Sequence, residues 1–227
     1  MNEKQPDAHH IEVVRTARFY TVGAMDDAVT DVWFALHGYG QLAAEFAREF
    51  APFRREARLI VIPEALSRFY RNNRERVMGA SWMTAEDRKM EIRDYVRYLD
   101  TLHDRVFERG VREGARLTVL GFSQGTATAT RWLAAGSVRA DRLILWGGLP
   151  AFELCTPEFR KRVPVERLEM VTGTRDRYTS PVHQREILPT LSEPGQPVEQ
   201  IVFEGGHALD PAVLARLMEG DPGESTT

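Results

Sequence analysis

The chain has 227 residues, of which 43 % are apolar and 28 % are charged, and its formal net charge is −3. These values are typical of an ordinary globular protein, and they favour one domain over residues 1–227 with flexible tails at about 1–10 and 220–227. A nearly balanced charge gives no indication of a nucleic-acid partner. Cys155 is the only cysteine, which excludes an internal disulfide and a zinc site built from cysteines.

No membrane or export signal is evident in the sequence. No stretch approaches the ~20 consecutive apolar residues that a membrane-spanning helix needs. The first residues, MNEKQPDAHHIEVV, lack the positively charged segment and the apolar segment of a secretory signal. We therefore expect a cytoplasmic protein without stable insertion into a membrane.

Short apolar segments recur along the chain and predict strands. The N-terminal stretch 11–23 predicts one or two antiparallel edge strands. Further strands are predicted over 31–36, 58–63, 116–122, 142–148, 167–173 and 199–206. Several of these segments are nearly continuous apolar runs, which is typical of parallel strands covered on both faces.

Helical patterns lie between these strands. In 85–109, apolar residues recur at steps of three and four. Helices are also predicted over 41–50 and 124–135, and from the Asp210–Pro211 pair, a good N-cap and first turn, to about Met218.

The alternation of strands and helices predicts an α/β fold with a mostly parallel sheet. About 53 residues separate the segments 58–63 and 116–122, far more than the short crossover of a regular eightfold barrel. An open, doubly wound sheet with helices on both faces is therefore favoured, and ligands bind beyond the carboxyl ends of its strands.

The stretch GFSQG, residues 121–125, places Ser123 between a predicted strand and a predicted helix. G-x-S-x-G by itself is a weak pattern, but this context is typical of a nucleophile on a sharp turn. Glycines flank such a turn because larger side chains would collide there. The backbone N–H of Gln124 would then lie at a helix N-terminus and could bind an oxyanion. The alternative is a small residue at a tight turn.

A serine nucleophile needs a base and an acid that orients the base, in the chain order Ser, Asp or Glu, His. Of the six histidines, only His207 follows the last predicted strand. Asp176 follows the strand 167–173, whereas Glu153 falls in a predicted helix. Each residue alone could be an ordinary loop residue, but their joint order predicts a triad of Ser123, Asp176 and His207.

The stretch HGYG, residues 37–40, directly follows the predicted strand 31–36. Its glycines allow a turn that directs the backbone N–H of Tyr39 toward the serine as a second oxyanion donor. His37 is interpreted as a structural residue that braces this loop. The alternative is a plain glycine turn.

Segment 64–83 combines arginines with apolar side chains and is interpreted as a pocket wall or a short lid. Trp82 and Met78 are the predicted substrate contacts. The arginines, Arg68, Arg71, Arg74 and Arg76, either form a basic rim that favours acidic substrates or belong to an ordinary solvated loop around a core tryptophan.

Together these motifs resemble the phospholipase/carboxylesterase family of α/β-hydrolases, whose members include acyl-protein thioesterases. LHGYG, GFSQG, GTRD and GGHAL are similar to its oxyanion-loop, nucleophile, acid and histidine segments, and SWM to its tryptophan loop. The resemblance covers roughly residues 30–215. It implies an α/β-hydrolase fold and a serine esterase that cleaves esters or thioesters through an acyl-enzyme. No metal or organic cofactor is implied, and the protein is expected to be a monomer or a homodimer.

The sequence departs from the family pattern in the loops around the expected site. Thr126 stands where the family has a glycine, Gln41 where it often has an aspartate, and Met83–Thr84 where it has Phe-Asp. The triad is untouched, but the substrate stays open between lipid, protein and small-molecule esters. A lactone hydrolase and a non-catalytic binding protein are the alternatives.

Overall fold

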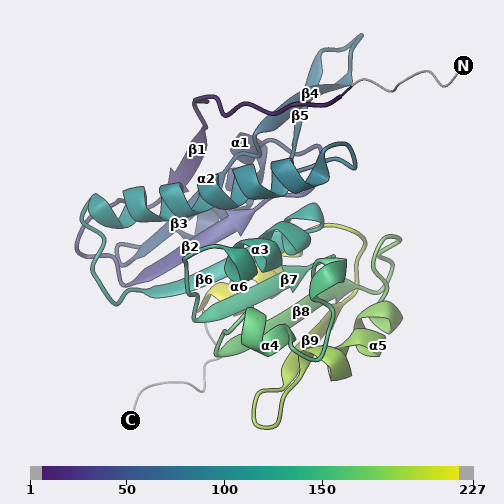
Figure 1. Ribbon diagram of the computed structural model, residues 1–227. Helices are drawn as coiled ribbons and strands as arrows, with labels where there is room; N and C mark the ends of the chain where they lie inside the picture. The colour runs from purple at the N-terminus through teal and green to yellow at the C-terminus, as the bar shows by residue number, and fades with distance from the viewer. Residues whose placement is uncertain (1–6, 220–227) are drawn as a thin grey trace, which may run out of the picture.

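The computed structural model describes residues 7–219. Residues 1–6 of the tail predicted at about 1–10, and the whole tail predicted at 220–227, therefore lie outside the described residues. A seven-stranded sheet runs through the molecule in the order β1-β3-β2-β6-β7-β8-β9 (Figure 1). Its strands are β1 (Phe19–Val22), β2 (Asp31–Leu36), β3 (Arg58–Pro63), β6 (Arg116–Phe122), β7 (Arg142–Trp146), β8 (Arg167–Gly173) and β9 (Val198–Phe203). All neighbouring strands are parallel except β1, which is antiparallel to β3.

The N-terminal prediction is only partly correct. β1 is an antiparallel edge strand, but residues 11–18 form no strand. Phe19 pairs with Pro63, the last residue of β3, and only one further hydrogen bond, from Glu64 N–H to Arg18 C=O, continues the ladder. β1 therefore begins at Phe19, because β3 offers no partner to the residues before it.

Helices cover both faces of the sheet, as a doubly wound fold requires. Apolar side chains of α1 (Ala43–Phe50) and α6 (Pro211–Glu219) pack on one face. The other face is covered by α2 (Arg88–Glu108), α3 (Gln124–Ala135), α4 (Phe159–Arg162) and α5 (Pro181–Leu191), and the short 3₁₀ helices are η1 (Ala51–Phe53) and η2 (Phe152–Leu154). Figure 1 shows α2 and α3 side by side across that face.

Two sequence-predicted helices illustrate why these elements form. The predicted stripe of α2 is buried at Tyr95, Leu99, Leu102 and Val106, which lie on one side of the helix. At α6, the Asp210 carboxylate accepts hydrogen bonds from the backbone N–H groups of residues 212 and 213 at 3.0 and 2.9 Å. This is the predicted N-cap, and it satisfies two donors that the helix itself cannot.

The segment interpreted as a pocket wall or lid is a β-hairpin rather than an irregular loop. β4 (Ser67–Asn72) and β5 (Val77–Ser81) form a separate two-stranded antiparallel sheet, which projects beyond the main sheet (Figure 1). Within residues 7–219, no helix has the length and apolar character needed to cross a membrane.

Candidate active site

The loop between β6 and α3 holds Ser123 in an unusual backbone conformation. Its φ of 54° and ψ of −115° are rarely adopted by a residue with a side chain, and such strain gathers at functional sites. A Cβ on Gly121 would lie 2.3 Å from the carbonyl oxygen of Gly125, and one on Gly125 would lie 2.2 Å from that of Leu36. Both glycines are therefore required for the turn, as the sequence indicated.

Ser123, His207 and Asp176 lie together at the carboxyl ends of β6, β9 and β8. Ser123 Oγ is 2.8 Å from His207 Nε2, and His207 Nδ1 is 2.7 Å from Asp176 Oδ2. The second carboxylate oxygen, Oδ1, accepts from the backbone N–H groups of Tyr178 and Thr179 at 2.8 and 3.0 Å. The Asp176 side chain is 1 % exposed and the His207 side chain 17 %, so the carboxylate is fixed inside the protein beside an accessible imidazole.

Two aromatic rings lie against the imidazole of His207. Phe122 lies at a centroid distance of 5.0 Å and Tyr178 at 4.6 Å. Gly147, whose φ is 61°, packs so closely that a Cβ there would lie 3.2 Å from two atoms of the ring. None of these three contacts was predicted from the sequence. Only Tyr178, an aromatic residue in a polar loop two positions after Asp176, carried a sequence signal.

Three other histidines lie away from Ser123, in agreement with the choice of His207. His10 contacts Asp87, His103 lies on α2 beside Asp104, and His183 lies in α5. Glu153, the rejected acid, lies in η2 and is bound by Arg131 at 2.6 Å. The hydrogen bond from Arg131 lowers the pKa of Glu153 to about 2.

Two backbone N–H groups close to Ser123 have no partner in the described part of the chain. The loop 37–40 touches the serine, since a Cβ on Gly38 would lie 3.1 Å from Ser123 Cβ. Gln124 begins α3, so its N–H belongs to the helix N-terminus. Among residues 7–219, the N–H groups of Tyr39 and Gln124 have no hydrogen-bond acceptor. They are free to bind an oxygen that carries negative charge.

The buried side chain of His37 connects this loop to the residue Ala65, which follows β3. Its buried Nδ1 is 2.8 Å from the carbonyl oxygen of Gly38, and its Nε2 is 3.1 Å from the backbone N of Ala65. Because the Ala65 N–H can only donate, Nε2 is the acceptor and Nδ1 carries the proton. Burial lowers the pKa of His37 to about 4, so the ring stays neutral near pH 7. The structural interpretation of His37 is therefore supported.

Trp82 is buried against the same loop. It is 2 % exposed, and its indole N–H donates to the His37 carbonyl oxygen at 2.9 Å. Its backbone N–H donates to the side chain of Gln124 at 3.1 Å. These contacts favour the alternative of a core tryptophan that positions the loop. Met78 lies on β5 opposite Tyr70, and its contact with substrate stays a prediction.

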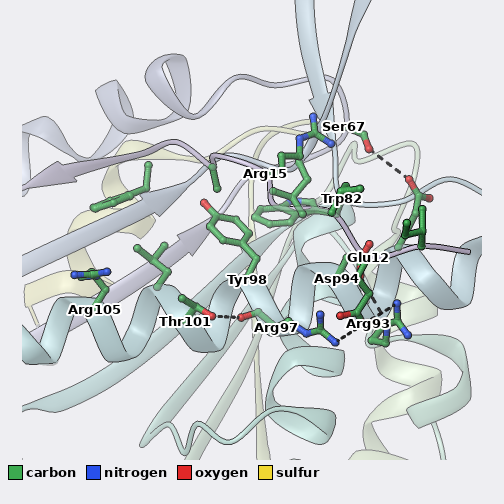
Figure 2. A pocket seen from close by; sticks show the side chains of 17 residues that line it. Glu12, Arg15, Ser67, Trp82, Arg93, Asp94, Arg97, Tyr98, Thr101 and Arg105 are labelled. Atoms are coloured by element: carbon green, nitrogen blue, oxygen red, sulfur yellow. Dashed lines mark hydrogen bonds and ion pairs between the residues drawn. The ribbon is translucent and has the colours of Figure 1, made fainter.

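A cavity of about 500 Å³ lies beside Trp82, between the N-terminal segment and α2 (Figure 2). Phe19, Tyr98 and Leu102 contribute to its lining, together with charged side chains such as Glu12 and Arg97. Neither Ser123 nor His207 lines it. Trp82 contacts His37, and His37 contacts Gly38, so two buried side chains connect the wall of this cavity to the loop that touches the serine. Residues 7–219 contain no group of three or more His, Cys, Asp or Glu side chains arranged to hold a metal ion.

Comparison with known proteins agrees with this architecture. No protein-family model matches the sequence, and no curated protein matches it. Solved structures do match: esterase PE8 superposes with a TM-score of 0.68 at 19 % identity, over 90 % of this chain and 97 % of that one. Acyl-protein thioesterase 2 from Zea mays gives 0.64 at 17 % identity, over 90 % and 97 %. The carboxylesterase from Bacillus cereus gives 0.64 at 14 % identity, over 89 % and 92 %.

The chain has the α/β-hydrolase fold. This confirms the fold class that the alternating elements predicted and the fold that the motif resemblance implied. Identities of 14–19 % show the fold alone, so the activity has to be argued from the site.

Proposed function

We propose that this α/β-hydrolase-fold protein is a serine esterase that cleaves carboxylic esters or thioesters through an acyl-enzyme. The observation that carries the proposal is the continuous hydrogen-bonded path from Ser123 Oγ through His207 to Asp176. Two backbone N–H groups without an acceptor within residues 7–219, those of Tyr39 and Gln124, are close to the serine. A nucleophile, a base, an acid that orients the base and an oxyanion site are the parts that acyl transfer needs.

In the first half-reaction, Ser123 Oγ attacks the carbonyl carbon and its proton passes to His207 Nε2. The carbonyl oxygen becomes an oxyanion, which accepts hydrogen bonds from the N–H groups of Tyr39 and Gln124. One such donor is worth about 3–4 kcal/mol in the transition state. The intermediate then collapses, the bond to the leaving alcohol or thiol breaks, and His207 Nε2–H protonates that group. The acyl group stays on Ser123.

In the second half-reaction, water attacks the acyl-enzyme while His207 Nε2 takes its proton. The intermediate then collapses, His207 gives that proton to Ser123 Oγ, and the acid is released. Asp176 acts through His207 in both steps. Its Oδ2 accepts the Nδ1–H, which leaves Nε2 as the acceptor that faces the serine. The backbone donors of Tyr178 and Thr179 hold Oδ1, so the carboxylate cannot turn away. No step requires a metal or an organic cofactor.

The first test is covalent labelling with a fluorophosphonate, which reacts with activated serines without requiring the natural substrate. We expect a mass increase on one peptide, that containing Ser123. Ser123→Ala should abolish the labelling, while Ser137→Ala, at an exposed serine, should retain it. Labelling that persists in Ser123→Ala would overturn the site assignment. Absence of labelling in the wild type would favour a binding protein.

The second test is hydrolysis of p-nitrophenyl esters with acyl chains of increasing length, with a lactone series beside it. Ser123→Ala should lower kcat by at least about 10⁴-fold, since loss of a triad member typically costs this much or more. An optimum at short acyl chains would indicate a small-molecule carboxylesterase, and an optimum at long chains a lipid or protein deacylase. Preference for the lactones would favour the lactone hydrolase.

A further inference from the structure

The hairpin β4–β5 is joined directly to the loop 37–40, named the oxyanion loop because it carries the proposed donor, the Tyr39 N–H. Gly40 N–H donates to the carbonyl oxygen of Ala80 at 2.8 Å, and Ala80 N–H donates to that of Gln41 at 3.3 Å. The ring of Tyr39 packs on Phe69 of β4 at a centroid distance of 5.2 Å. Tyr39 is 61 % exposed, so this aromatic pair presents an apolar surface beside the loop that carries the Tyr39 N–H. The hairpin therefore forms a wall of the candidate active site.

Arg71 is directed at the same loop by an irregularity in the hairpin. Tyr70 pairs with Met78 and Asn72 with Val77, so Arg71 is the extra residue of a β-bulge. Bulges next to active sites re-aim individual side chains. The partner strand gives way at Gly79, where a Cβ would lie 2.7 Å from Arg71 Cδ and from the Gly40 carbonyl oxygen. The side chain of Arg71 therefore crosses Gly79 and donates from Nη1 to the Gly40 carbonyl oxygen at 3.3 Å.

The charge of Arg71 is not neutralised by the described part of the protein. Arg68, on the same strand, lies 3.8 Å from the carboxylate of Glu64. Within residues 7–219, Arg71 has no carboxylate within ion-pair distance, and its one hydrogen bond is the long contact with Gly40. A guanidinium has five N–H donors in a planar fork that matches a carboxylate. Most of these donors remain available to a bound molecule.

We infer that Arg71 is a specificity-determining residue that binds a carboxylate of the substrate, so that the enzyme prefers esters that carry a negative charge near the scissile bond. The inference rests on the proposed esterase function. The Gly40 carbonyl belongs to the residue directly after Tyr39, whose N–H is the proposed oxyanion donor. A short substrate can therefore reach both groups at once, with its apolar part against Tyr39 and Phe69. Of the four arginines in this segment, Arg71 is the one that the bulge and Gly79 direct at the loop 37–40.

The test compares kcat/KM for matched charged and neutral esters, with the charge placed on either side of the scissile bond. For the acyl side, the pair is the 4-nitrophenyl monoester of glutaric acid and 4-nitrophenyl pentanoate. For the leaving-group side, it is 4-acetoxybenzoate and its methyl ester. We expect the wild type to favour the charged member of one pair by about tenfold or more, the range of a charge-assisted hydrogen bond. The pair that shows the preference identifies the side on which the carboxylate lies.

Three variants separate anion binding from support of the loop. Arg71→Gln should bring the ratio of charged to neutral kcat/KM close to one, mainly through a higher KM for the charged ester. Arg71→Lys should keep part of the preference, because it keeps the charge but loses the fork. Arg74→Gln, at the exposed end of the same hairpin, is the control and should behave as the wild type. An equal loss for charged and neutral esters in Arg71→Gln would overturn the inference, because it would indicate a brace for the oxyanion loop.

A binding measurement keeps this inference separate from the proposed function. Titration calorimetry with the 4-nitrophenyl monoester of glutaric acid uses Ser123→Ala, in which turnover should be blocked. The Kd of this ester should rise about tenfold or more when Arg71→Gln is added to the Ser123→Ala variant. If the ester binds in a way that depends on Arg71, but the wild type does not hydrolyse it or any other ester, the anion site is supported and the proposed esterase function is refuted. If hydrolysis depends on Ser123 but shows no preference for charged esters, and the Arg71-dependent binding is absent, only the anion site is refuted.

Discussion

The two sides of Ser123 are built in different ways. On the oxyanion side, His37 is 0 % and Trp82 2 % exposed, and hydrogen bonds join the loop 37–40 to the elements beneath it. On the base side, His207 lies on a loop at the end of β9, and Tyr178 beside it is 72 % exposed. The core holds the loop that carries the proposed oxyanion donor of Tyr39, while His207, the proposed base, lies nearer to solvent. Damage on the oxyanion side should therefore affect stability and rate together, and damage on the base side rate alone.

The largest expected effect is on the base side, in Asp176→Asn. Oδ1 accepts two backbone N–H groups, so the amide oxygen will occupy that place and the NH₂ will face His207. Nδ1 must then accept, Nε2 carries the proton, and the imidazole cannot take the proton of Ser123. We expect kcat to fall by about 10⁴-fold.

Thermal unfolding checks that the effect is confined to the rate. The Tm of Asp176→Asn should stay close to that of the wild type, because the side chain keeps its size and its backbone hydrogen bonds. A loss of activity smaller than tenfold would contradict the assignment of Asp176 as the acid.

The next effect is on stability and lies on the oxyanion side. Burial lowers the pKa of His37 from 6.5 to about 4. Above pH 6.5 the ring is neutral in both the folded and the unfolded chain. Between pH 6.5 and 4 the unfolded chain binds the proton and the folded protein does not, so stability is lost as the pH falls. The loss at pH 4 should reach about 3 kcal/mol.

Urea unfolding at pH 7.0, 5.5 and 4.5 measures this loss, with His37→Gln as the comparison. The glutamine can still accept from Ala65 but does not titrate. The variant should be less stable than the wild type at pH 7 and should lose less stability on acidification. Equal losses in the two proteins would show that His37 is not the group responsible.

A smaller effect on the same side is expected from Trp82→Phe. The variant leaves the buried carbonyl oxygen of His37 without the indole donor, which should cost about 1–2 kcal/mol of unfolding free energy. Since His37 directly precedes the oxyanion loop, kcat should also fall by about tenfold.

Trp132→Phe is the matched control for this prediction. Trp132 is also fully buried, and its indole N–H donates to Asp100 on α2 at 2.8 Å. We expect a similar loss of stability with kcat nearly unchanged. If both variants lost activity equally, the specific link between Trp82 and the oxyanion loop would be refuted.

The smallest effect belongs to the base side, in Tyr178→Ala. The exposed ring packs on His207 at 4.6 Å, and such aromatic contacts are worth about 0.5–1.5 kcal/mol. We expect a decrease in kcat/KM of roughly two- to tenfold and an unchanged Tm. Tyr178→Phe should retain the wild-type rate, and a loss as large in Tyr178→Phe would indicate a role for the hydroxyl group instead.

The sequence by itself was sufficient for the parts that depend on chain order and local sterics. The apolar runs identified the strands of the main sheet, and Ser123, Asp176 and His207 each follow one of them. Carboxyl ends of neighbouring parallel strands meet at one edge of a sheet, so this order is enough to bring the three residues together. Gly121 could be assigned to the turn because its clash, with the carbonyl oxygen of Gly125, is local. The G-x-S-x-G pattern also marked Gly125, but its close approach to the Leu36 carbonyl oxygen on β2 is a tertiary contact.

Other features were decided only by the tertiary structure, because they depend on contacts between segments distant in the sequence. The polar pattern of 67–81 did not predict a hairpin, which is held by the contact of Ala80 with Gly40 and Gln41. Trp82 was predicted to contact the substrate, but it is buried against His37. The local sequence does not determine which distant residue a tryptophan side chain contacts. The position of Arg71 follows from a bulge and from the missing side chain of Gly79 on the opposite strand. Such placement becomes visible only when the strands are paired.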